Sequence, residues 1–184
     1  EPGTYPNING VEQIGAKNQI MSQILAVALS CDLSRVFSIQ FSTAGSGVIF
    51  SDAGAVDGLH GICHTESMPQ PTVHAATTLT MGYLADFLQI LKDTPEGTGN
   101  LLDNSSILCT SELADGYTHN NFDFPIVIAG HGGGRLVGNV HYRSTTEESA
   151  TKAVLSALRG AGVDAPSFGA DEGYTEQGIS DLES

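Results

Sequence analysis

The sequence predicts an α/β fold, a three-layer sandwich with a mostly parallel sheet, in a chain of 184 residues. Helical patterns at 11–32 and 72–93 alternate with short apolar or β-branched runs at 35–41, 105–111 and 125–130. Alternating helices and strands favour a parallel sheet covered by helices. Glycine-rich or polar loops follow the runs, which is where an α/β protein places its site. We expect a single α/β domain over 1–184.

The expected helices have apolar residues at helical spacing. The first, over 11–32, would turn one face inward, formed by Ile14, Met21, Ile24, Leu25, Ala28 and Leu29. The second follows Pro71, a start signal, and ends before the turn-forming segment 94–99. A third covers 145–161, with Thr146 as a candidate cap, Glu147 and Glu148 in the first turn and Arg159 in the last.

The expected strands differ in their burial. Residues 35–41 alternate apolar and polar side chains, as a half-buried strand does, whereas 105–111 and 125–130 are short buried strands. Residues 138–142 are a further candidate strand. The acidic, glycine-rich tail 163–184 has few apolar residues, so we expect it to wrap the surface or fray.

The charge of the chain excludes some partners. Twenty-one acidic residues against seven basic ones give a formal charge of −14, which repels nucleic-acid backbones. We therefore expect no nucleic-acid partner. The acidic surface either holds cations or, as the favoured interpretation, keeps the protein soluble. No apolar run reaches the length of a membrane span, so we expect none.

Two segments carry the candidate chemistry, at 59–66 and at 111–119. His60 and His64 are four residues apart, a spacing that places both imidazoles on one helix face. They are either metal ligands or polar loop residues. Glu112, Asp115 and His119 would complete a mixed nitrogen and oxygen site for a divalent metal ion, zinc first, with manganese or iron as alternatives.

Other residues near these segments have two interpretations each. Cys63 is a thiolate ligand, a weak candidate nucleophile or, as favoured, a buried thiol. Glu66 either fixes an imidazole tautomer or starts a helix. His131 and Arg135, in and after a glycine run, are weak candidates for binding an anionic small-molecule substrate, although Arg135 could equally pair with a local carboxylate.

The three cysteines are widely spaced and contain no C-x-x-C pair, which indicates neither a disulfide framework nor a zinc ribbon. Cys31 and Cys109 lie in apolar runs. We expect both to be buried small hydrophobic residues.

The sequence HGICHT at 60–65 resembles the H-x-x-S-H-H signature of the HXXSHH family of bacterial proteins of unknown function. Further segments resemble landmarks of that family in the same order, at 24–36, 94–97, 101–105, 111–116, 119–120, 125–130, 132–134 and 167–169. Cys63 stands where the family has Ser, and Thr65 where it has its last His.

The resemblance implies a distant relationship to the alkaline phosphatase and sulfatase superfamily, and hence an alkaline-phosphatase-like, partial fold. It implies that the chain is the carboxyl-terminal portion of an exported protein, periplasmic or extracellular. A missing amino-terminal half, or a partner chain, would supply the nucleophile and one more acidic ligand. His60, His64, Glu112 and His119 follow the order of the superfamily's metal ligands, with Asp115 as a ligand or its neighbour.

The function expected from this resemblance is metal-dependent hydrolysis of a phosphate or sulfate ester, once the site is completed. The alternative is a catalytically inactive binding or structural module on the same fold. Metal content distinguishes the two, because only the first needs an ion.

Overall fold

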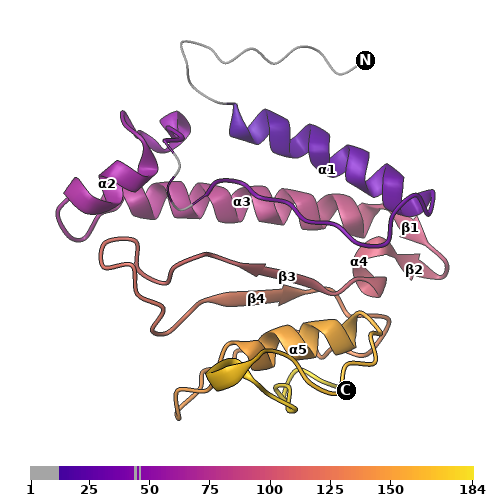
Figure 1. The fold of residues 1–184 in the computed structure, drawn as a ribbon. Coiled ribbons are helices and arrows are strands. Elements are labelled where there is room, and N and C mark those ends of the chain that lie inside the picture. Colours follow the sequence, from indigo (N-terminus) through magenta and orange to yellow (C-terminus); the bar gives the residue numbers. More distant parts are fainter. Residues whose placement is uncertain (1–12, 44, 46) are drawn as a thin grey trace. The chain divides into compact units, whose positions relative to one another are not determined.

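The computed structural model describes residues 13–43, 45 and 47–184, so the first two residues of the helix expected at 11–32 lie outside the described part (Figure 1). The chain divides into two compact units. Unit 1 comprises Glu1–Leu91, of which the described part begins at Gln13, together with Glu112–Asp123. Unit 2 comprises Lys92–Ser111 and Phe124–Ser184.

The helices carry most of the regular structure. They are α1 (Ile14–Ser30), α2 (Leu59–Thr65), α3 (Pro71–Asp93), α4 (Leu101–Asn104) and α5 (Thr151–Gly160), with short 3-10 turns at Ser51–Ala53 and Asp171–Gly173. The strands are short: β1 (Pro95–Glu96), β2 (Gly99–Asn100), β3 (Ile107–Thr110) and β4 (Ile126–Ala129). Within the described residues, no helix is both long and apolar enough to cross a membrane.

The predicted three-layer sandwich with a mostly parallel sheet is wrong. The described strands form two separate two-stranded sheets, β1 with β2 and β3 with β4, and both pairs are antiparallel. The strands β3 and β4 were expected at nearly these positions. However, the segment between Thr110 and Ile126 contains no helix, and parallel neighbours need a crossover that is usually helical. The chain therefore returns as a hairpin, with Ile107 opposite Ala129.

The predicted strand at 35–41 has the expected alternation but is not a strand. Phe37, Ile39 and Phe41 are half-buried and the residues between them are exposed. The Phe37 and Phe87 rings pack edge to face, with ring centroids 5.6 Å apart, and the ring centroids of Phe41 and Tyr83 are 6.4 Å apart. The alternation of half-buried and exposed side chains thus arises from packing against α3 and not from a sheet. Residues 138–142, the other candidate strand, also lack strand structure.

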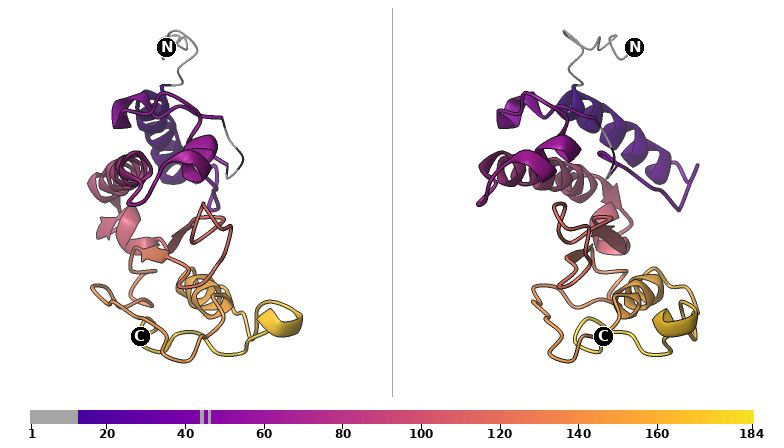
Figure 2. Two further views of the ribbon diagram at one scale, coloured as in Figure 1. Left: turned by 90° about the vertical axis from the view of Figure 1, so that its left-hand side faces the viewer. Right: turned by 60° about the vertical axis from the view of Figure 1, so that its left-hand side comes forward.

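In unit 1, α1 and α3 lie side by side (Figures 1 and 2). Of the face that α1 was expected to bury, Ile14 is buried but Met21 and Ile24 are exposed, and the buried face continues instead through Asn18, Ser22 and Ala26. Small residues explain the difference. A Cβ on Gly15 would lie 3.1 Å from the Tyr83 ring, and the Asn18 amide donates to the Tyr83 carbonyl at 2.9 Å.

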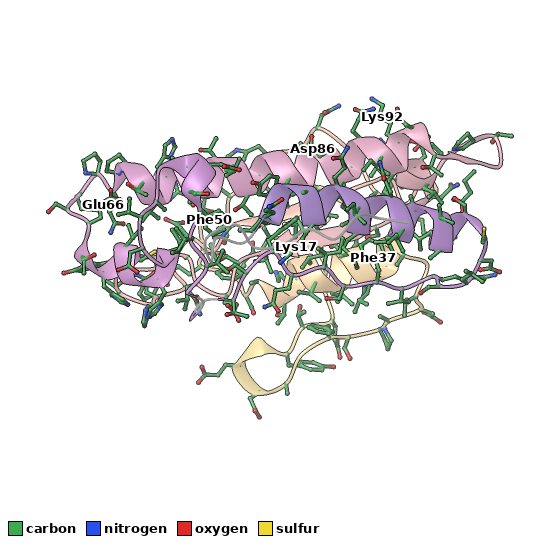
Figure 3. The ribbon with its side chains drawn as sticks, turned by 90° about the horizontal axis from the view of Figure 1, so that it is seen from above. Lys17, Phe37, Phe50, Glu66, Asp86 and Lys92 are labelled. Carbon is green, nitrogen blue, oxygen red and sulfur yellow. The ribbon has the colours of Figure 1, made fainter. Side chains whose placement is uncertain are left out.

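The core of unit 1 joins these helices to the segment before α2. Its buried members are Ile14, Phe50, Ala55, Ala76 and Tyr83. Figure 3 labels Phe37 and Phe50, whose side chains come from the chain between α1 and α2. Leu59 and Ile62 pack against this core, so the apolar side of α2 is fixed and its histidines lie on the rest of its surface.

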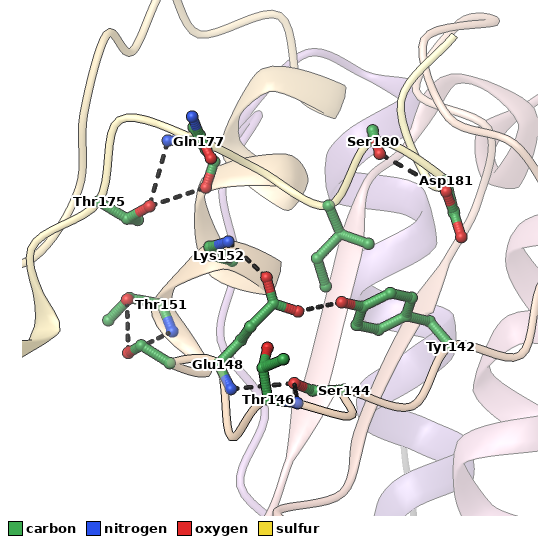
Figure 4. Close-up of polar contacts among 12 residues, drawn as sticks. Tyr142, Ser144, Thr146, Glu148, Thr151, Lys152, Thr175, Gln177, Ser180 and Asp181 are labelled. Carbon is green, nitrogen blue, oxygen red and sulfur yellow. Dashed lines mark hydrogen bonds and ion pairs between the residues drawn. The ribbon is translucent and has the colours of Figure 1, made fainter.

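In unit 2, α5 begins six residues later than the predicted helix at 145. The Ser144 hydroxyl accepts hydrogen bonds from the amides of Thr146 and Glu148, and Glu147 has a left-handed φ of 55°. That turn is incompatible with a helix. Instead Glu148 contacts Tyr142 and the Lys152 ammonium, the latter at 2.5 Å (Figure 4). Arg159 lies in the last turn of α5, as predicted.

The acidic tail 163–184 follows the surface of unit 2. Glu183 accepts from the buried Ser156 hydroxyl at 2.6 Å and lies 3.4 Å from the Arg159 guanidinium. Arg159 also donates to the Ala165 and Glu176 carbonyls. The tail was expected either to wrap the surface or to fray, and these contacts show that it wraps the surface of unit 2.

Candidate metal centre

The first part of the site is α2, which carries two of the candidate ligands. His60 and His64 are one helical turn apart, and their ring centroids are separated by 4.9 Å. The predicted helical spacing is therefore correct. Because Leu59 and Ile62 hold α2 against the core, the two imidazoles share the opposite part of the helix surface, where His60 is half-buried and His64 exposed.

The second part is a tight turn between Asp115 and Asn120, which pair as an isolated antiparallel bridge. The Asp115 carboxylate accepts hydrogen bonds from the Tyr117 amide at 2.8 Å and from the Thr118 hydroxyl at 2.9 Å. These bonds lower the pKa of Asp115. At the end of the turn His119 adopts a left-handed φ of 57°, a conformation in which His is enriched but still uncommon.

These two parts bring His60, His64 and His119 together, and we call them the histidine cluster. One ring nitrogen from each residue lies within 4.8 Å of the other two. The Nε2 atoms of His64 and His119 are 3.1 Å apart. The His119 ring centroid lies 4.8 Å from that of His64 and 5.8 Å from that of His60. Residues 55 positions apart in the sequence thus direct ligand nitrogens at one region.

The spacing suits a small metal ion. Two imidazole nitrogens bound tetrahedrally to zinc, at about 2.0–2.1 Å each, are about 3.3 Å apart. The separation of 3.1 Å between His64 and His119 is close to that value. The widest separation, up to 4.8 Å, requires one imidazole to move inward by somewhat more than 1 Å. His64 and His119 are exposed, so side-chain rotation can supply this movement.

The predicted carboxylate ligands stand apart from this cluster. Neither Glu112 nor Asp115 belongs to the group of ligand atoms within 4.8 Å. Asp115 instead shapes the turn that presents His119, and Glu112 is exposed at the start of the same loop. The described set is therefore three nitrogens, in place of the mixed nitrogen and oxygen set expected from the sequence.

Cys63 lies against this turn as a partly buried thiol. A Cβ on Gly116 would lie 3.1 Å from the Cys63 Sγ atom, so the thiol and the glycine fix how closely the turn approaches α2. Burial, followed by the charge of Asp115, raises the pKa of Cys63. A protonated thiol is a poor nucleophile, which favours the spectator interpretation. Cys109 is also partly buried, but Cys31 is exposed, contrary to expectation.

Glu66 starts a helix, one of its two predicted roles. Its carboxylate accepts hydrogen bonds from the amides of Thr72 and Val73 in the first turn of α3, at 3.0 and 3.2 Å. Desolvation alone would raise the pKa of Glu66, but hydrogen bonding from the Thr72 side chain, and then from the Val73 and Thr72 amides, lowers it. The Gln70 side chain donates to the Cys63 and Glu66 carbonyls. Together Glu66 and Gln70 lock the end of α2 to the start of α3.

A partly open pocket of about 420 Å³ adjoins the histidine cluster on the His64 side. Its lining residues include the acidic Asp115 and Glu66 as well as Met68 and Tyr117. The Tyr117 ring centroid lies 6.3 Å from that of His64. A ligand bound in this pocket would therefore lie next to a metal held by the cluster.

His131 and Arg135 belong to a different part of the chain, the glycine-rich turn of unit 2. The Arg135 guanidinium donates to the Gly132 carbonyl at 2.9 Å, and the Arg135 carbonyl accepts from the Ser184 amide. A Cβ on Gly138 would lie 2.9 Å from the His131 ring. These contacts are structural, and the role of both residues in binding an anionic substrate stays a prediction.

Comparison with protein-family models, curated proteins and solved structures found no match to this chain. The resemblance to the HXXSHH family, with its implied export and its phosphatase-like site, therefore stays a prediction.

Sequence reasoning missed the residues that position the cluster. Gly116 allows the turn to approach Cys63, and Gln70 joins α2 to α3. The sequence does hold one signal for the turn, since Asp115 is followed by Gly116 and Thr118, a pattern typical of an aspartate that accepts from the amide two residues on. No comparable signal marks Gln70.

Proposed function

We propose that the protein binds a divalent transition-metal ion, zinc in the first place, through His60, His64 and His119. The observation that carries the proposal is the convergence of three imidazole nitrogens within 4.8 Å, two of them 3.1 Å apart. Three nitrogen ligands favour zinc over manganese, which prefers oxygen ligands. Three protein ligands also leave a coordination position open, as in catalytic rather than structural zinc sites.

Titration calorimetry of the metal-free protein with zinc tests the proposal. We expect one ion per chain, with binding abolished in His64→Ala and in His119→Ala. His74→Ala is the matched control, because His74 is an exposed histidine in α3 outside the cluster. Absence of zinc binding in the parent protein, or equal binding in His64→Ala and His74→Ala, would contradict the proposal.

The reaction implied by the family resemblance is hydrolysis of a phosphate or sulfate ester. A zinc ion in the cluster would polarise the ester and lower the pKa of a bound water molecule. The three histidines would hold the ion, and the residues that line the adjoining pocket would form its wall. A second candidate, distinct from the metal-free module considered above, is a catalytically inactive metal-binding module in which the ion only ties α2 to the turn at Asp115–Asn120.

Hydrolysis of p-nitrophenyl phosphate and sulfate by the zinc-loaded protein distinguishes these two functions. Turnover that disappears in His64→Ala but persists in His74→Ala would support the hydrolase. Zinc binding without turnover would favour the structural or binding module, and would leave the metal proposal standing.

A further inference from the structure

The charged residues of the pocket beside the histidine cluster have the same sign of charge as a phosphate or sulfate, so they disfavour these anions. Two of its lining residues, Asp115 and Glu66, are carboxylates, and none of the described residues that line it is lysine or arginine. Both carboxyl groups accept hydrogen bonds from backbone amides, which fix their positions. The chain as a whole carries a formal charge of −14, so cations are attracted and anions repelled during approach.

The remaining walls suit a small organic cation. Tyr117 is 58% exposed and lines the pocket, so a cation in the pocket can contact its aromatic ring. Met68, at 82% exposure, adds a polarisable apolar surface. The volume of about 420 Å³ lies within the range of small-ligand sites. His64 lines the pocket and belongs to the cluster, so one ligand can reach both.

We propose that this pocket binds the ammonium group of a small amino-acid-like ligand, whose other, anionic end reaches the metal held by the histidine cluster. The ammonium lies toward Asp115 and Glu66 and against the Tyr117 ring. The second half of this assignment rests on the proposed metal binding. The first half does not, because the carboxylates and the aromatic ring are present without an ion.

Three probes of similar length separate the charges of the two ends: 4-aminobutyrate, butyrate and butylammonium. Binding is followed by NMR through the signals of Tyr117 and His64, with and without zinc. Butylammonium should bind in both conditions. In the presence of zinc, 4-aminobutyrate should bind at least about fivefold more tightly than butyrate, because only the first satisfies both ends of the site.

Isosteric variants identify the residues responsible. Asp115→Asn and Glu66→Gln keep a hydrogen-bond acceptor and remove one charge each, and we expect each to weaken butylammonium binding by about fivefold. Asp86→Asn is the matched control, since Asp86 is exposed fifteen residues into α3 (Figure 3), about 22 Å along the helix from its start. Circular dichroism of each variant checks that the helices are retained.

The outcomes separate this inference from the metal proposal. Butyrate binding as tightly as butylammonium in the zinc-free protein, or equal affinity in Asp115→Asn, Glu66→Gln and Asp86→Asn, would overturn the ammonium pocket while leaving zinc binding intact. Butylammonium binding that depends on Asp115 in a protein without zinc affinity would support the pocket and refute the metal proposal.

Discussion

Two groups of polar side chains, one in each unit, differ in the kinds of atoms that they bring together. In unit 2, Glu148 accepts from the Lys152 ammonium and from the Tyr142 hydroxyl, so donors meet acceptors (Figure 4). In unit 1, the histidine cluster directs three like nitrogens at one region, and the His64 and His119 Nε2 atoms lie 3.1 Å apart, within hydrogen-bond distance. The first arrangement pairs donors with acceptors of opposite kind, whereas the second brings together ring nitrogens of the kind that bind a transition-metal ion.

The largest expected difference between the two groups is the effect of zinc on stability. An ion that binds only the folded state stabilises it by about 2.7 kcal/mol at one hundred times its dissociation constant. We expect this increase in the free energy of unfolding in the parent protein and in Glu148→Gln, but not in His119→Ala. Urea unfolding with and without zinc measures it, and an equal increase in His119→Ala would contradict the assignment.

The same ion should protect the turn that carries His119. Zinc would link residues 64 and 119, which are 55 positions apart, and so hold the loop Glu112–Asp123 to α2 within unit 1. Limited proteolysis should cut this loop several times more slowly with zinc than without it. The glycine-rich turn at 130–134 of unit 2, which holds no cluster residue, provides the internal control because its cleavage rate should not change.

Two cysteines sharpen the description of the cluster's surroundings. Burial raises the pKa of Cys63, whereas Cys31 is exposed. Alkylation by iodoacetamide should therefore be several times slower at Cys63 than at Cys31, because the thiolate is the reacting form. Peptide mass mapping after a timed reaction measures both sites. Faster reaction at Cys63 would restore it as a candidate nucleophile.

The close packing of Gly116 against Cys63 determines how near the turn that carries His119 lies to α2. We therefore expect Gly116→Ala to weaken zinc binding. The added Cβ would lie 3.1 Å from Sγ, and relieving such a contact costs on the order of 1 kcal/mol, or about fivefold in affinity. Removing the sulfur in the double variant Gly116→Ala, Cys63→Ala should recover most of the loss. Failure of this rescue would show that the turn is positioned by something else.

The smallest expected effect is the pH dependence contributed by Glu148. Hydrogen bonds from Lys152 and then Tyr142 lower the pKa of Glu148 below its ordinary value of 4.5. A lowered pKa in the folded state adds stability above the unfolded value and loses it as the pH falls through the folded value. Urea midpoints measured between pH 6 and 3 should therefore fall less steeply in Glu148→Gln than in the parent. Parallel curves would contradict this role.

Local features of the fold were predictable from the sequence, but its architecture was not. Pro71 and the following apolar spacing identify α3 almost to the residue, and the apolar runs identify β3 and β4. The predicted burial of β4 is wrong, because none of its residues is buried and Val127 is exposed. Whether β3 and β4 pair parallel or antiparallel depends on the structure of the loop between them. Whether residues 35–41 form a strand depends on which surface their apolar side chains pack against. Both are tertiary properties that alternation of side chains cannot specify.

The candidate site was predictable to a similar extent. The four-residue spacing of His60 and His64 predicts a shared helix face, and α2 has it. The inclusion of His119 follows from the turn at Asp115–Asn120, for which Asp115 and Gly116 are a sequence signal. Which side chains of that turn point toward α2 depends on the left-handed φ of His119, which the sequence does not reveal. Asp115, expected as a ligand or its neighbour, accepts hydrogen bonds within the turn that carries His119.

X-ray absorption at the zinc edge of the zinc-loaded protein tests the central claim most directly. Three imidazole ligands with zinc–nitrogen distances of about 2.0–2.1 Å, reduced in number in His119→Ala, are the expected result. A zinc–sulfur distance of about 2.3 Å would place Cys63 in the site and contradict the histidine cluster. Fewer than three imidazoles in the parent protein would contradict it equally.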